Sequence, residues 1–339
     1  MRGFKNFYHR WKRHLIDGIL LRGRRARFED QLIIETTNRC SLGCSCCPNG
    51  NGVPLRKRGV MSRDTFEKVL ANIDMPVKNC FLHLCGEPFL NPDLPYFCQK
   101  LIERKIYPII FSNGYGIDLE LLDKVLDVKG VKIGFSMELY SSYVYESIRR
   151  PGLHSKALQS IEAISQHFAK AKRKFSLNMI LKPGITSEEV AGIARRMFDD
   201  FPQLSSITFS GEWPWPGLPE TGNIAGHLSR DPHLCHRIKG LPVILWDGRV
   251  SFCDLDYDGS AVIGNITEDP LSKIANNPAA RAIRRDLLSH NYQKRPLCGR
   301  CVLPRYSSFT LTVNPGMLKK MGSEAESGYF KVIDDYFNG

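Results

Sequence analysis

Short apolar strands alternate with helical segments between residues 31 and 210, and this alternation restricts the fold most. The strand candidates are residues 32–36, 80–85, 107–113, 131–137, 175–181 and 206–210. Helical periodicity fills the segments between them, with Ser62, Asp118 and Ser187 as expected helix caps. Strictly alternating strands and helices indicate parallel βαβ units. The sequence therefore predicts an α/β protein with a partial (β/α)6 barrel of the TIM type, whose functional groups gather at the carboxyl ends of the strands.

The composition of the sequence changes after Ser210, where Pro, Gly and Trp become frequent. Residues 243–253 are typical of a β-hairpin, and residues 269–289 of a helix. We therefore expect four parts: a basic amphipathic helix at 1–30, the barrel at 31–215, a smaller domain at 216–310 and a C-terminal extension at 311–339.

The first 30 residues carry nine Lys and Arg against three acidic residues, about half of the formal net charge of +12. Their apolar residues recur at helical spacing and would form one face: Phe4, Phe7, Tyr8, Trp11, Leu15 and Ile19. Such a helix suits docking on the rest of the protein, or peripheral contact with a membrane or an acidic partner. No nucleic-acid-binding module accompanies the charge, so no nucleic-acid partner is expected.

No apolar run approaches the roughly 18 residues of a membrane span, and the N-terminus lacks the pattern of a signal peptide. We expect a cytoplasmic protein. In that reducing compartment, eleven cysteines indicate metal ligands or reactive thiols rather than disulfides.

Cys40, Cys44 and Cys47 follow the first predicted strand with the spacing C-x3-C-x2-C. Three thiolates on one loop can hold three irons of a 4Fe-4S cluster and leave the fourth iron open. Structural zinc usually takes a closed set of four ligands, and Cys46 could complete such a set. The spacing favours the cluster and leaves zinc as the alternative.

This motif resembles that of the radical S-adenosylmethionine (SAM) superfamily. The resemblance implies that SAM binds the open iron and that an external one-electron reductant, of the flavodoxin or ferredoxin type, drives its cleavage. Cleavage yields a 5'-deoxyadenosyl radical that takes hydrogen from the substrate. Residues at the next strand ends match the family's SAM contacts in the same order: Gly86, Glu87, Pro88, Ser112, Asn113, Ser136, Glu138, Arg149 and Asn178. This order extends the resemblance over about 150 residues.

A second cysteine set resembles the SPASM/Twitch extension of radical SAM enzymes. It comprises Cys235, Cys253, Cys298 and Cys301, and no cysteine follows Cys301. The resemblance therefore implies the shorter Twitch form, found in 2-deoxy-scyllo-inosamine dehydrogenase, with one auxiliary 4Fe-4S cluster held by four cysteines. A zinc ribbon is the alternative.

An auxiliary cluster that is fully ligated by protein can accept an electron. We therefore hypothesise an enzyme that oxidises an alcohol of a sugar, amino sugar or cyclitol to a ketone. The alternatives are an epimerase of a carbohydrate-type natural product with Cys85 as the catalytic hydrogen donor, an enzyme that modifies a ribosomal peptide, and a non-catalytic zinc protein. Cys80 and Cys98 are expected to pack in the core.

Four residues after predicted strands are candidates for substrate binding: Tyr140, Glu212, Trp213 and Trp215. Aromatic rings together with one carboxylate suit a polyhydroxylated or aminated ring. The competing interpretation is that the two tryptophans pack the linker between the two domains.

Overall fold

The computed structural model describes residues 30–53, 55–218, 228–229, 234–239, 242–306, 309–320 and 323–337. The helix predicted at residues 1–30 lies outside the described residues, apart from Asp30. Within the described residues, no helix is both long and apolar enough to cross a membrane.

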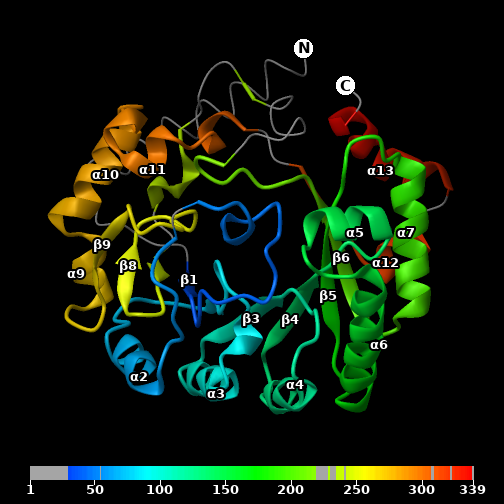
Figure 1. The fold of residues 1–339 in the computed structure, drawn as a ribbon, viewed down its shortest axis with the longest axis horizontal. Helices are drawn as coiled ribbons and strands as arrows, with labels where there is room; N and C mark the ends of the chain where they lie inside the picture. Colours follow the sequence, from blue (N-terminus) through cyan, green and yellow to red (C-terminus); the bar gives the residue numbers. More distant parts are fainter. Residues whose placement is uncertain are drawn as a thin grey trace.

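All six predicted strands form, and they lie parallel in chain order. They are β1 (Gln31–Ile34), β2 (Asn79–Phe81), β3 (Tyr107–Ser112), β4 (Lys132–Ser136), β5 (Phe175–Ile180) and β6 (Leu204–Ser210). Helices cover the outer face of this curved sheet (Figure 1). They are α2 (Arg63–Ala71), α3 (Leu94–Glu103), α4 (Leu119–Leu126), α5 (Ser142–Ile148), α6 (His154–Lys170) and α7 (Ser187–Asp200). The predicted partial barrel is confirmed.

Two of the three predicted helix caps are correct. The side chain of Ser62 accepts the backbone N–H of Thr65, and that of Asp118 accepts those of Glu120 and Leu121. The prediction for Ser187 is wrong by one residue. Thr186 caps α7, because its hydroxyl accepts the N–H of Glu189 while the Glu189 carboxylate accepts that of Thr186.

The smaller domain continues the sheet of the barrel. Its predicted hairpin consists of β7 (Val243–Ile244) and β8 (Arg249–Ser251), and β7 pairs in parallel with β1. The strand β9 (Val262–Asn265) follows β8, so one side of the ten-stranded sheet belongs to this domain. The hairpin thereby covers the edge of β1 that the barrel leaves open.

The helix expected at residues 269–289 is two helices, α9 (Leu271–Ala275) and α10 (Pro278–Leu288). The chain breaks there because Pro278 has no N–H to continue α9 and Asn277 caps α10 by accepting the N–H of Ala280. Shorter helical turns complete this region: η3 (His236–Lys239), η4 (Tyr292–Lys294), α11 (Pro296–Gly299) and η5 (Leu303–Arg305).

The C-terminal extension contributes elements that the sequence did not predict. The strand β10 (Thr310–Val313) pairs antiparallel with β6 and closes the other edge of the sheet. Two helices follow, α12 (Pro315–Lys320) and α13 (Ser323–Phe337), and the Asp334 carboxylate of α13 accepts the N–H of Ser187 on α7. The extension is thus part of the barrel wall.

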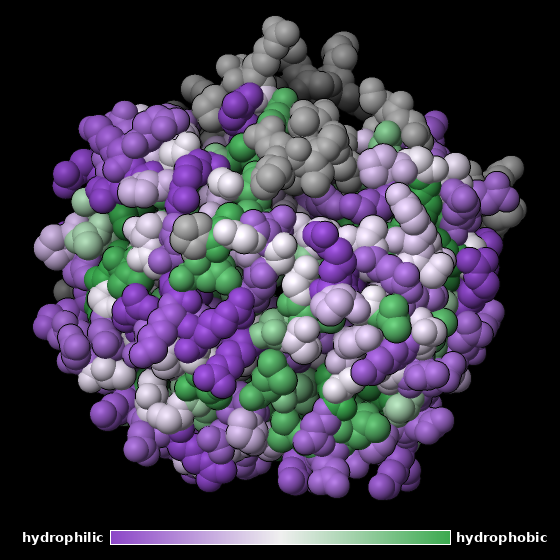
Figure 2. Space-filling view, in the orientation of Figure 1, coloured by the Kyte–Doolittle hydropathy of each residue, from purple (hydrophilic) through white to green (hydrophobic). Residues whose placement is uncertain are grey.

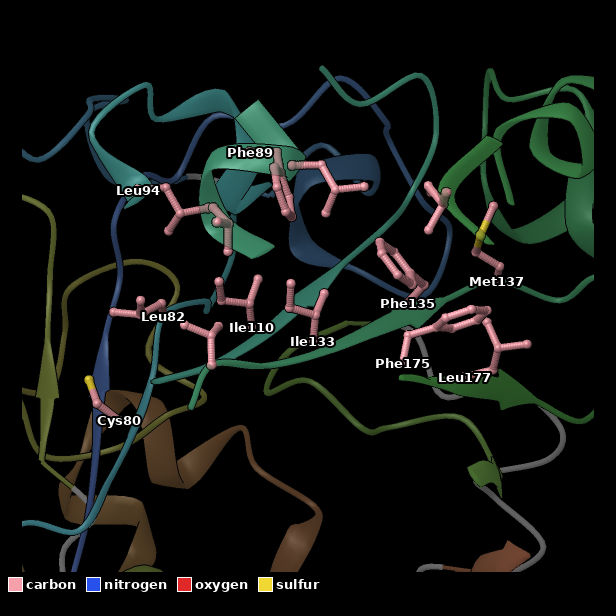
Figure 3. Packing of buried hydrophobic residues seen from close by; sticks show 14 of the residues in the cluster. Cys80, Leu82, Phe89, Leu94, Ile110, Ile133, Phe135, Met137, Phe175 and Leu177 are labelled. Carbon is pink, nitrogen blue, oxygen red and sulfur yellow. The ribbon is translucent and has the colours of Figure 1, made fainter. Parts of the chain in front are cut away.

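The two faces of the sheet differ in packing. Alternate residues of β5 (Phe175, Leu177 and Met179) are buried, and Phe175 packs edge-on against Phe135 of β4 (Figure 3). Cys80 and Cys98 lie fully buried in this core, as predicted. The intervening residues of β5 keep partial exposure, so the barrel has a dense outer layer and an accessible inner face. On the side shown in Figure 2, hydrophilic residues surround small hydrophobic patches.

Candidate functional site

The first cysteine loop begins after β1 and is held against the end of α5. The N–H of Gly43 donates to the Arg150 carbonyl at 2.6 Å, and that of Ser45 to the Ile148 carbonyl at 2.8 Å. A Cβ at Gly50 would lie 2.3 Å from the Cys44 carbonyl oxygen, so the turn η1 (Pro48–Gly50) requires glycine there. Backbone contacts therefore fix the positions of the loop's cysteines.

Hydrogen-bond donors surround two of these thiols. Cys40 Sγ accepts the Leu42 N–H at 3.5 Å and Asn113 Nδ2 at 3.6 Å. Arg149 Nη1 lies 3.9 Å from Cys44 Sγ. Burial raises the pKa of both thiols, whereas these donors and the arginine charge stabilise thiolates. The residues present thus fit a cluster that binds thiolate sulfur.

Within the described residues, no three His, Cys, Asp or Glu side chains converge on the position of one metal ion. A zinc centre needs such convergence, with each sulfur about 2.3 Å from the metal. A 4Fe-4S cluster binds each thiolate at a separate iron, so its ligands lie farther apart. The spacing of Cys40, Cys44 and Cys47 on one loop suits such a cluster. Cys46 lies half-buried near Arg149, and nothing in the structure explains a thiol there.

Glu87 joins three strand ends. Its buried carboxylate accepts Ser112 Oγ at 2.8 Å and the Asn113 N–H at 2.7 Å, while its own N–H donates to the Arg39 carbonyl. It also accepts the N–H of Phe89 at the start of η2 (Pro88–Leu90). Burial raises the pKa of Glu87, and these donors lower it. The carboxylate that the sequence predicted as a SAM contact therefore also positions the loops around it.

Glu138 and Arg149 bind each other. The guanidinium donates to the carboxylate at 2.7 and 2.8 Å, Glu138 is fully buried, and the Ile180 N–H donates to the same carboxylate at 3.3 Å. Ser136 of β4 and Asn178 of β5 are direct partners across the two strands. The structure thus gathers the remaining predicted SAM contacts on the inner side of β4 and β5, next to the cysteine loop.

The four cysteines of the second set line one cavity. It is bordered by Cys235, Cys253, Cys298, Cys301, Phe252, Leu255, Leu287, Tyr292, Leu297 and Leu303, together with Pro216, Arg237 and Pro304. The Leu255 N–H donates to Cys253 Sγ at 3.4 Å. Close by, the Arg237 guanidinium pairs with the Asp254 carboxylate at 2.6 and 2.7 Å. Four sulfurs in an apolar wall fit an iron-sulfur cluster whose irons are all bound by protein.

Comparison with known families agrees with this geometry. Residues 34–197 match the model of the radical SAM superfamily. The chain contains a radical SAM domain. Residues 235–302 match the SPASM iron-sulfur cluster-binding domain. A radical SAM domain implies SAM and a 4Fe-4S cluster, and a SPASM domain implies auxiliary iron-sulfur binding, so the predicted cofactors are supported.

Curated relatives of this radical SAM chain are distant. A GTP 3',8-cyclase of Limosilactobacillus fermentum (strain NBRC 3956 / LMG 18251) is 26% identical over 167 residues, which are 48% of this chain and 49% of the relative. A PqqA peptide cyclase of Granulibacter bethesdensis (strain ATCC BAA-1260 / CGDNIH1) is 28% identical over 98 residues, 28% of this chain and 25% of the relative. The chain spans about half the length of the GTP 3',8-cyclases that it matches.

Solved structures share the fold of this radical SAM chain. BtrN in complex with AdoMet and 2-DOIA has a TM-score of 0.55 at 20% identity, over 81% of this chain and 93% of that one. SuiB of Streptococcus suis bound to the precursor peptide SuiA has a TM-score of 0.62 at 15% identity, over 86% of this chain and 73% of that one. At these identities the likeness shows the fold.

The predicted substrate residues occupy different surroundings in this radical SAM fold. Glu212, which follows β6, is buried and pairs with Lys182, which follows β5. Tyr140 donates its hydroxyl to the Ile180 carbonyl at 2.8 Å. Trp213 is 37% exposed, whereas Trp215 packs with Leu255 and Tyr257 of the smaller domain. Tyr140 and Glu212 thus lie at the strand ends, and the setting of Trp215 resembles linker packing.

Lys182 and His83 are inner-face residues that sequence reasoning missed. His83 Nδ1 accepts the Phe111 N–H at 3.2 Å, which leaves the proton of the neutral ring on Nε2. Burial lowers the pKa of His83 to about 4, so the ring is neutral near pH 7. The positions of both residues, within or directly after predicted strands, were a usable signal.

We expect Glu138→Ala to lower the free energy of unfolding by about 3 to 5 kcal/mol, because it leaves the Arg149 charge buried without its carboxylate. Urea denaturation of the apoprotein measures this effect apart from cofactor binding. Asp247→Ala is the matched control, because Asp247 pairs with a half-buried arginine, Arg249, near the surface, and such pairs contribute about 0 to 1 kcal/mol. Equal losses in the two variants would contradict a buried Glu138–Arg149 pair.

We expect Cys298→Ser to reduce the iron content from about eight to about four per chain, because one cavity loses a thiolate ligand while the SAM site keeps all of its ligands. Reductive cleavage of SAM should persist in this variant. Iron analysis and quantification of 5'-deoxyadenosine test both statements. Loss of all iron, or an unchanged iron content, would contradict two independent centres.

Proposed function

We propose that this chain is an oxidoreductase that converts an alcohol of a sugar, amino sugar or cyclitol to a ketone. Bound SAM and its cluster would supply a 5'-deoxyadenosyl radical to remove hydrogen from the carbinol carbon, and the auxiliary cluster would accept the second electron. The observation that carries the proposal is that the four cysteines of the second set line one cavity. A centre fully bound by protein has no open position for a substrate, which suits electron transfer.

The chain's own residues have three tasks in this reaction. Asn113 and Arg149 place donors against Cys40 and Cys44 and so stabilise their thiolates. The Glu212 carboxylate, held by Lys182 at the carboxyl end of the strands, is the proposed acceptor for the proton of the substrate hydroxyl. Tyr140 is the proposed wall of the substrate site, since it is fixed by its bond to the Ile180 carbonyl. Trp213 and Trp215 are also proposed substrate contacts.

A second candidate is an epimerase, and a buried thiol favours it. Cys85 is 5% exposed, follows β2 and lies beside the predicted SAM segment of Gly86 and Glu87. Burial raises the pKa of Cys85 well above its ordinary value, so the thiol keeps the hydrogen that an epimerase would return to the substrate radical. Under this alternative Cys85 is the catalytic hydrogen donor.

The proposal includes an external one-electron reductant of the flavodoxin or ferredoxin type, and a location in the reducing cytoplasm. A role of the basic N-terminal segment in docking to a membrane or a protein is likewise a proposal.

Turnover in deuterated water separates these functions. The reconstituted enzyme is incubated with SAM, a reductant and candidate aminocyclitols, nucleoside sugars or precursor peptides. Oxidation predicts a product that has lost two hydrogens and has gained no deuterium on carbon. Epimerisation predicts an isomer with one deuterium on carbon, which Cys85→Ala should abolish. A modified peptide, as the likeness to the SuiB fold would allow, would overturn both carbohydrate assignments.

A further inference from the structure

One charged pair borders the cavity of the second cysteine set. Among the described residues that line this cavity, Arg237 is the one with a charged side chain. Its Nε and Nη2 donate to the two carboxylate oxygens of Asp254 at 2.7 and 2.6 Å. The two side chains are only 16% and 17% exposed, so solvent screens these charges less than it screens charges at the surface.

The Asp254 carboxylate also lies beside a predicted cluster ligand. The Cys253 thiol donates to Asp254 Oδ1 at 3.7 Å, and this is the oxygen that accepts Arg237 Nε. A cysteine that binds iron loses its proton, so cluster binding would place a thiolate next to a carboxylate. Two adjacent anions repel each other unless a cation lies with them. The Arg237 guanidinium supplies that positive charge.

An aromatic ring from the end of the barrel packs on the same guanidinium. The central carbon of Arg237 lies 5.7 Å from the centre of the Trp213 ring. Trp213 directly follows Glu212, the proposed proton acceptor, after β6. The Tyr306 hydroxyl donates to the Glu212 carbonyl at 2.8 Å, and Tyr306 belongs to the hydrophobic cluster against which Cys253 packs. Arg237 thus lies where the carboxyl end of β6 meets the auxiliary cysteines.

We propose that Arg237, oriented by Asp254 and Trp213, raises the reduction potential of the auxiliary cluster. This inference rests on the proposed function, in which the substrate radical loses its hydroxyl proton, passes one electron to that cluster and becomes a ketone. The added electron makes the cluster more negative by one charge, and a nearby cation stabilises that state. The Asp254 carboxylate has the opposite effect, so the two residues together set the potential.

Redox titration of the reconstituted full chain, followed by electron paramagnetic resonance, tests this role apart from turnover. The signal of the auxiliary cluster is the one that disappears in Cys298→Ser, because Cys298 lines the cavity. We expect Arg237→Met to lower the potential by about 59 mV or more, which is a tenfold change in the ratio of oxidised to reduced cluster. Arg237→Lys keeps the charge without the planar fork and should recover part of this shift.

Asp254→Asn removes the opposing charge and should raise the same potential. The double variant Arg237→Met/Asp254→Asn removes both charges and should titrate close to the wild type, which a purely structural role of Arg237 would not produce. Arg249→Met is the matched control, because Arg249 pairs with Asp247 in the same domain and is not among the residues that line the cavity. This control should leave the potential unchanged.

The iron content of each variant shows whether the auxiliary cluster is present, and if Arg237→Met loses it, the potentials of Asp254→Asn and of the double variant decide. A potential that is unchanged or higher in Arg237→Met, or unchanged or lower in Asp254→Asn, would overturn the inference, as would a wild-type chain without an auxiliary cluster. The expected shifts in an enzyme that epimerises its substrate would support the role of Arg237 and refute oxidation. A ketone product without these shifts would do the reverse.

Discussion

Replacing Cys44 with alanine is expected to abolish reductive cleavage of SAM and to lower the iron content from about eight to about four per chain. Cys44 is buried in the loop after β1, and its sulfur faces the Arg149 guanidinium at 3.9 Å. Without this ligand the SAM-side cluster has two thiolates left from its set of three. Anaerobic reconstitution followed by chromatography of 5'-deoxyadenosine measures the effect.

Cys98→Ala is the matched control for Cys44→Ala. Cys98 is also a buried cysteine, but it lies on α3 within the hydrophobic core. We expect this variant to lose some stability through the small cavity and to keep its iron and its SAM cleavage. If Cys98→Ala lost a cluster and Cys44→Ala did not, the assignment of ligands would be wrong.

Gly86→Ala is expected to disrupt SAM binding and to lower the free energy of unfolding by about 3 kcal/mol. A Cβ at this position would lie 2.1 Å from the Thr37 carbonyl oxygen, which is a backbone atom and cannot rotate away. The segment that carries Glu87 would have to move away from the loop after β1. Equilibrium dialysis with SAM and urea denaturation measure the two effects.

Gly192→Ala makes the same chemical change where there is room. Gly192 lies inside α7, and the nearest atom to an added Cβ is Arg196 Nη1 at 3.7 Å. Since alanine favours the helix over glycine, this variant should gain about 0.5 to 1 kcal/mol and bind SAM normally. A similar loss in both variants would show that close packing at Gly86 does not govern the site.

The barrel strands were predictable because each buries its outer side chains under a helix and so reads as a short apolar run. The edge strand β10 was not, because Thr310 and Thr312 alternate with Leu311 and Val313 over only four residues, beyond the last cysteine. Its position depends on pairing with the open edge of β6, which only the assembled sheet reveals. Asn277 and Pro278 indicate the break between α9 and α10, but the helical periodicity of residues 269–289 favoured one continuous helix.

The grouping of the second cysteine set around one cavity agrees with the prediction from the sequence, whereas the partners of charged residues depend on the neighbours that folding provides. Glu138 and Arg149 were expected to contact SAM, and the structure shows that they also bind each other. Glu35 and Arg56 are 21 residues apart and belong to no motif, so their pairing could not be inferred from the sequence. Lys182 and Glu212 are 30 residues apart and follow different strands, so their pairing depends on the assembled sheet.

We expect this chain to hold two iron-sulfur clusters and to generate a radical from SAM. The most direct test is anaerobic reconstitution of the full chain, with metal analysis and quantification of 5'-deoxyadenosine after addition of SAM and a reductant. We expect about eight irons per chain and formation of 5'-deoxyadenosine. About two zinc ions per chain, with SAM left intact, would contradict it.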